Sequence, residues 1–322
     1  MKKLLLIAIC FVSIVSKAQI SNKFKGNPKE FKELTNRTLV IQTFEENEKV
    51  VKKLSKPKDA VELAKYQKFV KDFNTNFKVY VQKYWKMNAS IEVKNQAEMK
   101  ALRKAKNKSY AVIEYTVLMD NGSFGLDSHS GIGAITYSNI EDDGAYAQIY
   151  LNDADENPNE TLLEDDYRFA LETLGNNVNW IISNNKVLNY DKYSDKIAKE
   201  NCGRLKGKAL LIGKDAMYKG QTIENAKVNY NGNLNFVSEL ELNEAFVNKT
   251  KNTAVLFSIP FGIVKQNFVV LQHSNFVYSK VIVDCETGEI LWSSMPGIFS
   301  GGNFQKKLSE KEFKNMADCK IL

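Results

Sequence analysis

The chain lacks the features that most directly indicate an integral membrane protein, a metal-binding module or a hydrolase. After residue 18, no apolar run approaches the roughly 20 residues that a membrane-spanning helix needs. The four cysteines show no metal-type spacing. No G-x-S-x-G turn, which exposes a nucleophilic serine, is present. With only two histidines, these absences favour a binding or assembly protein over an enzyme.

The first eighteen residues have the charged, apolar, small-residue order of a secretory signal. Two lysines precede an apolar run over residues 4–15, which leads into a Ser-Lys-Ala cleavage sequence. This run reaches about 18 Å, too short for a hydrocarbon core of about 30 Å. Cys10 lacks the preceding small residue that lipid attachment requires. We expect residues 1–18 to be removed, and the chain from Gln19 to be exported to the periplasm, cell surface or extracellular space.

Three cysteines remain after the signal: Cys202, Cys285 and Cys319. In an oxidising compartment they can form one disulfide and leave one thiol, and the sequence does not choose the pair. Hydrophobic residues at 43% and charged residues at 26% are near globular averages. A core of that size needs no disulfide framework.

The net charge of +7 hides a strong asymmetry along the chain. Residues 19–110 hold 22 Lys and Arg against 10 Asp and Glu, whereas residues 111–185 hold only Arg168 against 14 acids. Expected export argues against nucleic acid as the partner. Either the two segments neutralise one another in the fold, or the basic segment attaches to an anionic polymer or partner.

The chain reads as two copies of one α/β unit. The first copy predicts strands over 38–44, 91–93, 110–118, 132–138 and 145–151, a long helix after Pro57, and helices over 97–106 and 162–182. In the long helix an aromatic stripe from Tyr66 to Tyr84 predicts a core face. The second copy predicts strands over 209–212, 235–237 and 253–258, a helix over 239–248, a hairpin turning at 286–288 and a closing helix over 308–317.

Residues of the two copies match at a nearly constant shift, which indicates an internal repeat. Glu98, Lys106, Lys108 and Ala111-Val112 match residues 143 further on; His129-Ser130 matches His273-Ser274, and Tyr137-Ser138 matches Tyr278-Ser279. We therefore predict an α/β (α+β) fold of two tandem related lobes, each a mixed sheet flanked by helices, with a C-terminal β-hairpin and closing helix. The expected divisions are 1–18 signal peptide, 19–152 first lobe, 153–206 closing helix and linker, and 207–322 second lobe.

The hairpin segment Asp284-Cys285-Glu286-Thr287-Gly288-Glu289-Ile290 resembles the "D-x-x-T-G-E-I" hairpin of curli-secretion and penicillin-binding-protein-activator lipoproteins. Their small α/β lobe is also likened to the TolB amino-terminal domain. Residues 236–242 and 254–256 are similar to that lobe's strand, helix and strand, and 91–113 gives a second copy without the T-G pair. The resemblance implies envelope work through protein contacts and carries over no catalytic residues. This chain departs from that family in having no lipid-bearing cysteine.

The two histidines and one glycine-rich segment are weak candidates for a metal site and a nucleotide site. His129 and His273 occupy matching positions, so a copied structural histidine explains them, and a shared metal or pH-sensing site at a pseudo-twofold interface is the alternative. Gly203 to Ala209 has one residue too few between its glycines for a phosphate loop, lacks the hydroxyl that holds Mg²⁺ and precedes a strand. We therefore reject a nucleotide site there.

An acidic loop is the metal candidate. Asp153, Asp155, Asn157 and Glu164, with Asn159 and Thr161, fall at the ligand positions of a Ca²⁺-binding loop. Pro158 stands where that template needs glycine. A linker whose acids favour the dipole of the following helix explains the same residues. Ca²⁺ is thus the only cofactor considered, and no other is expected.

These patterns favour an exported, non-enzymatic envelope protein that acts through contacts with a protein or a cell-wall component. Duplicated lobes also create a cleft, so a solute- or polymer-binding module is the first alternative. A hydrolase with carboxylates brought together from distant positions is the second alternative. The sequence leaves the oligomeric state open.

Overall fold

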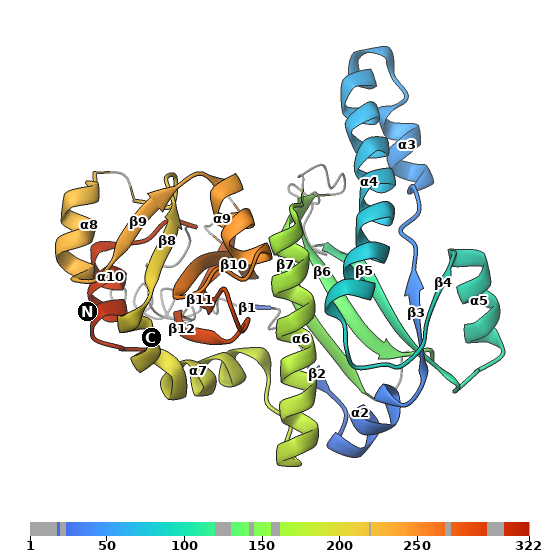
Figure 1. The fold of residues 1–322 in the computed structure, drawn as a ribbon. Helices are drawn as coiled ribbons and strands as arrows, with labels where there is room; N and C mark the ends of the chain where they lie inside the picture. Colours follow the sequence, from blue (N-terminus) through green and yellow to red (C-terminus); the bar gives the residue numbers. More distant parts are fainter. Residues whose placement is uncertain are drawn as a thin grey trace, which may run out of the picture.

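Two mixed sheets flanked by helices form two lobes that lie side by side in the computed structural model (Figure 1). The structure describes residues 18–19, 24–119, 130–141, 145–155, 162–218, 220–267, 272–294 and 306–321. The predicted α/β architecture of two related lobes is confirmed. The signal prediction for residues 1–18 lies outside the described residues, apart from Ala18.

The first lobe is built on a six-stranded sheet of order β2-β7-β6-β5-β3-β4. Its strands are β2 (Phe24–Lys25), β3 (Thr38–Gln42), β4 (Ile91–Lys94), β5 (Tyr110–Met119), β6 (Ser130–Asn139) and β7 (Tyr146–Asp155). Its helices are α2 (Pro28–Thr35), α3 (Glu48–Leu54), α4 (Ala60–Tyr84, after the 3-10 turn Pro57–Asp59), α5 (Gln96–Lys104) and α6 (Glu164–Asn184). β3 pairs in parallel with β4 and β5, and β5, β6 and β7 pair antiparallel.

The second lobe repeats this topology in the order β12-β11-β10-β8-β9, with β1 paired to β10. Its strands are β1 (Ala18–Gln19), β8 (Ala209–Gly213), β9 (Leu234–Val237), β10 (Thr253–Asn267), β11 (Gln272–Asp284) and β12 (Ile290–Ser294). Its helices are α7 (Tyr190–Asn201), α8 (Ile223–Tyr230), α9 (Glu239–Val247) and α10 (Glu310–Ala317). β8 pairs in parallel with β9 and β10, and β10, β11 and β12 pair antiparallel.

Strand registers and helix caps support the predicted shift of 143 residues. Ile91 and Ala111 flank one residue of β3, and Leu234 and Ala254 flank one residue of β8. A capping box opens α5, and another opens α9 143 residues later. The lysines that follow these helices, also 143 apart, both adopt left-handed backbone, with φ of 49° and 54°. The two lobes therefore share local geometry as well as strand order.

One predicted match between the copies is wrong. Ser138 pairs with Val112, and Val283 pairs with Val255, so Ser138 corresponds to Val283 rather than to Ser279. β10 and β11 extend further than β5 and β6, and their register shifts between Pro260 and Gly262. Because of that extension, the Tyr-Ser pairs at 137–138 and 278–279 lie at different positions along the strands of the two hairpins.

The predicted stripe of α4 packs against the first sheet as expected. Its buried residues are Tyr66, Phe69, Val70, Phe73, Phe77, Val81 and Tyr84. In the second lobe α8 takes the place of α4 and spans 8 residues against 25. Only Ala226 and Tyr230 of α8 are buried. The long helix of the first lobe is therefore reduced to a short helix in the second.

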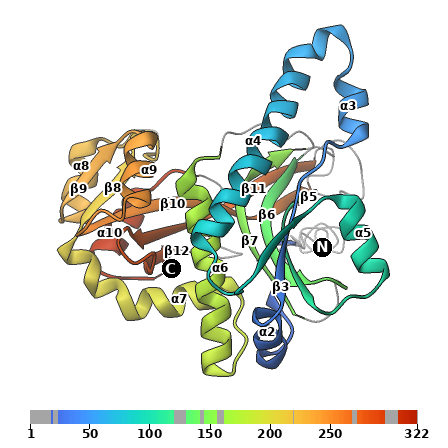
Figure 2. The same ribbon diagram turned by 45° about the vertical axis from the view of Figure 1, so that its right-hand side comes forward.

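Helix α6 lies between the two lobes (Figures 1 and 2). The apolar core of the first lobe continues through Phe169 and Leu171 of α6 to Phe246 of α9 and Val255 of β10. On the opposite face of the second sheet, a separate core joins β8, β10 and β12 to α8 and α10. Because one core crosses the junction, the lobes are packed together rather than merely tethered.

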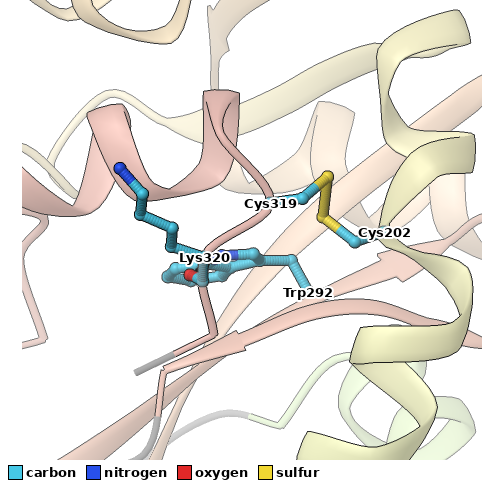
Figure 3. Close-up of a disulfide and its surroundings, with 4 residues drawn as sticks. All are labelled: Cys202, Trp292, Cys319 and Lys320. Atoms are coloured by element: carbon cyan, nitrogen blue, oxygen red, sulfur yellow. Dashed lines mark hydrogen bonds between the residues drawn. A yellow bond between two sulfur atoms is a disulfide. The ribbon is translucent and has the colours of Figure 1, made fainter.

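A disulfide joins Cys202 to Cys319 beside the second core, and Cys285 is a buried free thiol (Figure 3). The sequence had left this pair open. Trp292 packs next to it and donates its indole N–H to the Lys320 carbonyl at 3.0 Å. Cys202 is the C-cap of α7. This helix lies within residues 153–206, where only one helix and a linker were predicted. The disulfide thus ties α7 to the C-terminal segment.

Within the described residues, no helix combines the length and the apolar composition needed to span a bilayer.

Candidate functional site

A pocket of about 580 Å³ lies where the two lobes meet. It opens at the carboxyl ends of the parallel strands β8 and β9, the position where α/β sheets commonly bind ligands. Its lining also includes the first turns of α6 and α9 and part of β10. The residues are Leu151, Leu162, Asp165, Asp166, Gly213, Lys214, Asp215, Ala216, Val237, Ser238, Glu239, Leu242, Val255, Leu256, Phe257, Ser258, Pro260, Lys306 and Lys307.

The local sequence explains why two helices begin at this pocket. Ser238 is the N-cap of α9, and its hydroxyl and backbone N–H contact the Glu241 carboxylate at 2.7 Å. At α6 the Asp166 carboxylate accepts the Leu163 backbone N–H at 2.9 Å. Both arrangements satisfy amide groups that a helix start leaves open. The pocket is therefore bordered by two capped helix N-termini from different lobes.

Asp165 is the one buried carboxylate among the described residues of this lining. Its side chain is 7% exposed, and its Oδ1 has no hydrogen-bond partner within the described chain. Its backbone N–H donates to the Asn243 side chain of α9 at 3.0 Å, which fixes the first turn of α6 against the second lobe. A buried carboxylate oxygen without a hydrogen bond costs stability. Because Oδ1 has almost no solvent-accessible surface, it is enclosed by protein rather than open to the pocket.

Burial raises the pKa of Asp165 to about 7. Backbone amides of residues 165 and 166 oppose that shift, and the negative charges of Glu239 and Glu164 add to it. Burial dominates because removing a carboxylate from water penalises its charged form. The group therefore changes charge near neutral pH, unlike a solvated aspartate.

Arg168 lies one turn after Asp165 on α6 and connects the two lobes. It is the only Lys or Arg among residues 111–185. Its side chain is fully buried. Its Nη1 donates to the carbonyls of Phe246 and Cys285, the latter at 3.0 Å, and its Nε donates to Glu172 at 3.0 Å. Its guanidinium carbon lies 4.0 Å from the centre of the Phe246 ring. This network holds the wall of the pocket in place.

The T-G pair of the second hairpin contributes to the same junction. Gly288 has φ of +71°, a left-handed conformation that favours glycine. A Cβ at this position would overlap the Glu172 carboxylate. The left-handed backbone therefore favours glycine at this turn, which lies against the Glu172 side chain of α6.

The predicted Ca²⁺ ligands are only partly described. Asp153 and Asp155 belong to β7, opposite Ile132 and Ser130, and their side chains lie outside the described residues, as does Asn157. Glu164 accepts from Lys83 at 2.6 Å and from Tyr84 at 2.7 Å. In the described part of the chain, no group of three or more His, Cys, Asp and Glu could hold a metal ion. The Ca²⁺ site stays a prediction.

The other residues singled out from the sequence are placed as follows. His129 lies outside the described residues, and His273 lies in β11 opposite Gln266, with its side chain outside the description. The segment from Gly203 forms a 3-10 helix and runs into β8, as expected for a stretch that precedes a strand. Burial raises the pKa of the Cys285 thiol to about 12, so this cysteine is not a reactive thiolate.

Searches for similar proteins found no match among family models, curated proteins or solved structures. The resemblance to the envelope lipoprotein lobe therefore stays a prediction.

Sequence reasoning missed Asp165 as a site residue. It named Glu164 as the last residue of the acidic loop and did not consider Asp165 or Asp166, of which Asp166 caps the helix. Three consecutive acids are more than a first turn requires, and this surplus was the available signal. Burial of Asp165 depends on α9, 78 residues further along the chain, and no local pattern reports it.

Proposed function

We propose that this protein is an exported, non-enzymatic binding protein that holds a ligand in the pocket between its two lobes. The observation that carries the proposal is a pocket of about 580 Å³ where the lobes meet, lined by both apolar and charged side chains and bordered by one buried carboxylate, Asp165. Concave sites that combine apolar surface with fixed polar groups are typical of ligand sites. The Cys202–Cys319 disulfide supports export, because disulfides persist in oxidising compartments.

Blocking the pocket tests this proposal. A thermal-shift screen of amino acids, amines, sugars and short cell-wall peptides should yield at least one compound that raises the melting temperature. Leu242→Trp, which places a large side chain in the lining, should abolish that shift. Leu240→Trp on the exposed side of α9, where Leu240 is 64% exposed, is the matched control and should retain it. A shift that survives Leu242→Trp would place binding elsewhere.

A second role, attachment to an anionic envelope component, is favoured by the hairpin of α3 and α4. This hairpin projects beyond the first sheet (Figure 1). Lysines 49, 52, 53, 56 and 58 at its tip are all exposed. Three other bases of this segment pair with the acidic segment: Lys83 with Glu164, Arg103 with Glu114 and Lys108 with Glu141. These three pairs neutralise part of the basic segment, and the lysines of the hairpin are exposed to solvent.

A charge-reversed tip tests that second role. Lys52→Glu/Lys56→Glu/Lys58→Glu should abolish co-purification with the native envelope fraction and leave the melting temperature nearly unchanged, since these side chains are exposed. The wild-type attachment should also weaken as salt rises. Attachment that is unchanged in the triple variant would remove the hairpin from this role.

A further inference from the structure

The hairpin of α3 and α4 presents a run of lysines to solvent. Residues 49–58 hold five lysines and no Asp or Glu. Lys49, Lys52 and Lys53 share one face of α3, while the two buried residues of this helix pack into the core of the first lobe. The other two lysines lie in the turn that leads to α4, and all five are exposed. The hairpin therefore has a buried apolar side and a cationic outer side.

Ion pairs within the described chain do not use four of these side chains, namely Lys49, Lys52, Lys56 and Lys58. The acids nearest to them in sequence have other roles. Glu62 pairs with Lys65 at 2.9 Å. Glu48 lies in the first turn of α3 and Asp59 directly precedes α4, positions where a negative charge stabilises the start of a helix. The cationic side of the hairpin is therefore available to a partner.

Helix stability accounts for only part of this cluster. Lys52 and Lys53 lie in the last turn of α3, where a cation interacts favourably with the helix dipole. Lys49 lies in the first turn, where a cation opposes the dipole, and Lys56 lies beyond the end of the helix. The cluster as a whole therefore points to a role outside the fold.

We propose that the tip of this hairpin docks on an anionic bilayer surface, with its lysines facing the phosphate head groups. This inference rests on the second proposed role, attachment to an anionic envelope component, and deepens it by naming that component. It does not depend on the pocket between the lobes. Clusters of four to eight basic residues are typical of segments that bind anionic lipid surfaces. Because the hairpin projects beyond the first sheet, its lysines can approach a flat surface together (Figures 1 and 2).

An exposed apolar side chain beside the lysines favours a bilayer over a soluble polyanion. Val61 lies in the first turn of α4, next to the tip, and is 67% exposed. The boundary between head groups and acyl chains takes up an apolar side chain and leaves neighbouring lysines at the level of the phosphates. A charged polymer in water offers no such apolar layer. The combination of lysines and Val61 therefore matches a membrane surface.

Co-sedimentation with vesicles tests the proposal, using the protein in the form found in the envelope fraction. We expect binding to vesicles that contain phosphatidylglycerol and not to vesicles of phosphatidylcholine alone, with binding that weakens as salt rises. Lys52→Glu/Lys56→Glu/Lys58→Glu should lower the partition coefficient at least about a hundredfold, since each lysine near an anionic surface adds to the attraction. Equal binding to both kinds of vesicle would overturn the inference.

A second charge reversal is the matched control. Lys29→Glu/Lys32→Glu/Lys186→Glu changes the net charge by the same amount, and all three lysines are exposed. They lie on α2 and just after α6, at the end of the first lobe opposite the hairpin (Figure 1). This variant should keep most of the binding. Equal losses in the two triple variants would show attraction by net charge alone and would overturn docking by the hairpin.

A third pair of variants tests the contact of Val61 with the bilayer. Val61→Ser should lower binding to anionic vesicles several-fold, because a side chain taken up by the interface is made polar. Val79→Ser should leave binding unchanged, since Val79 is 50% exposed but lies about 27 Å further along α4. Unchanged binding by Val61→Ser would contradict docking of the tip on a bilayer.

The inference and the role on which it rests can fail separately. Binding to soluble polyphosphate without binding to any vesicle would overturn the bilayer inference. If the charge-reversed hairpin then still loses co-purification with the envelope fraction, the second proposed role stands. If co-purification is also unchanged, both fail.

Discussion

The two lobes share one topology but differ at the face that carries α5 in the first and α9 in the second. At equivalent positions, the first lobe has Arg103 and Glu114, which form an ion pair at 3.3 Å. The second lobe has Phe246 and Phe257, whose rings meet edge to face at 5.2 Å. Phe257 also stacks on Phe169 of α6 at 4.5 Å. One copy of the face thus became apolar and docks on the other lobe, while its counterpart remained polar.

This difference sets which face of each lobe is used for docking. The α9 face of the second lobe packs against the closing helix of the first lobe, which is a head-to-tail contact. The corresponding α5 face of the first lobe keeps a polar pair and does not take part in this junction. The junction also borders the pocket that contains Asp165.

The largest expected effect on stability comes from replacing Phe246 of the second lobe by arginine, the residue that the first lobe has at the equivalent position. Phe246→Arg places a second guanidinium beside the buried Arg168, whose guanidinium carbon lies 4.0 Å from the Phe246 ring. We expect the free energy of unfolding to fall by about 4 kcal/mol in chemical denaturation. Adding Phe257→Glu should restore part of this loss by recreating the pair of the first lobe.

The control for this comparison lies in the first lobe. Replacing Arg103 and Glu114 together by methionine should change stability by less than about 1 kcal/mol, because an apolar pair substitutes well for a partly exposed ion pair. A loss there as large as that of Phe246→Arg would contradict the distinction between the two faces.

The second lobe should depend on its disulfide, because its short α8 buries only two side chains. Cys202→Ser/Cys319→Ser opens a loop of 117 residues, and we expect a loss of about 3 kcal/mol. Hydrogen exchange should locate the loss in β8, α8 and α10 rather than in α4. Uniform loss of protection over both lobes would instead show that the lobes unfold as a single unit.

Asp165 should destabilise the junction at high pH. Its folded pKa of about 7 lies above the ordinary aspartate pKa of 3.8, so the folded state binds more protons between these values and stability falls as pH rises through that window. Asp165→Asn removes this loss. We expect the variant to be more stable than wild type at pH 8, by on the order of 3 kcal/mol, and to gain little at pH 4. An equal difference at both pH values would contradict this assignment.

The hairpin turn should show the smallest of these effects. Gly288→Ala combines a left-handed φ with an overlap on Glu172, and we expect a loss of about 2 kcal/mol. Gly220→Ala is the matched control, since Gly220 has φ of +92° with nothing within 4 Å of an added Cβ. Equal losses at the two glycines would show that docking against Glu172 contributes nothing.

Much of the fold was predictable because its signals are local. The stripe of α4, the alternation in β5 and the caps at Glu98 and Glu241 follow from periods and short motifs. Helices α7 and α8 were missed. Helix α8 buries only Ala226 and Tyr230, so it shows little apolar periodicity in the sequence. The repeat was found from helix and turn residues, whereas matching by the Tyr-Ser pairs failed within the lengthened hairpin.

The site was less predictable than the fold because it depends on the packing of one lobe on the other. Asp165 lies beside Glu164 and Asp166 in sequence, yet of these three acids only Asp165 is buried. Its surroundings come from α9 and β8, far along the chain. The pairing of Cys202 with Cys319 likewise depends on how the C-terminal segment returns to α7.

The most direct test is an NMR titration of the Asp165 side-chain carboxyl carbon, assigned by comparison with Asp165→Asn. Burial of this carboxylate where the lobes meet predicts a midpoint near pH 7. A midpoint near that of a solvated aspartate would contradict a buried acid between the lobes.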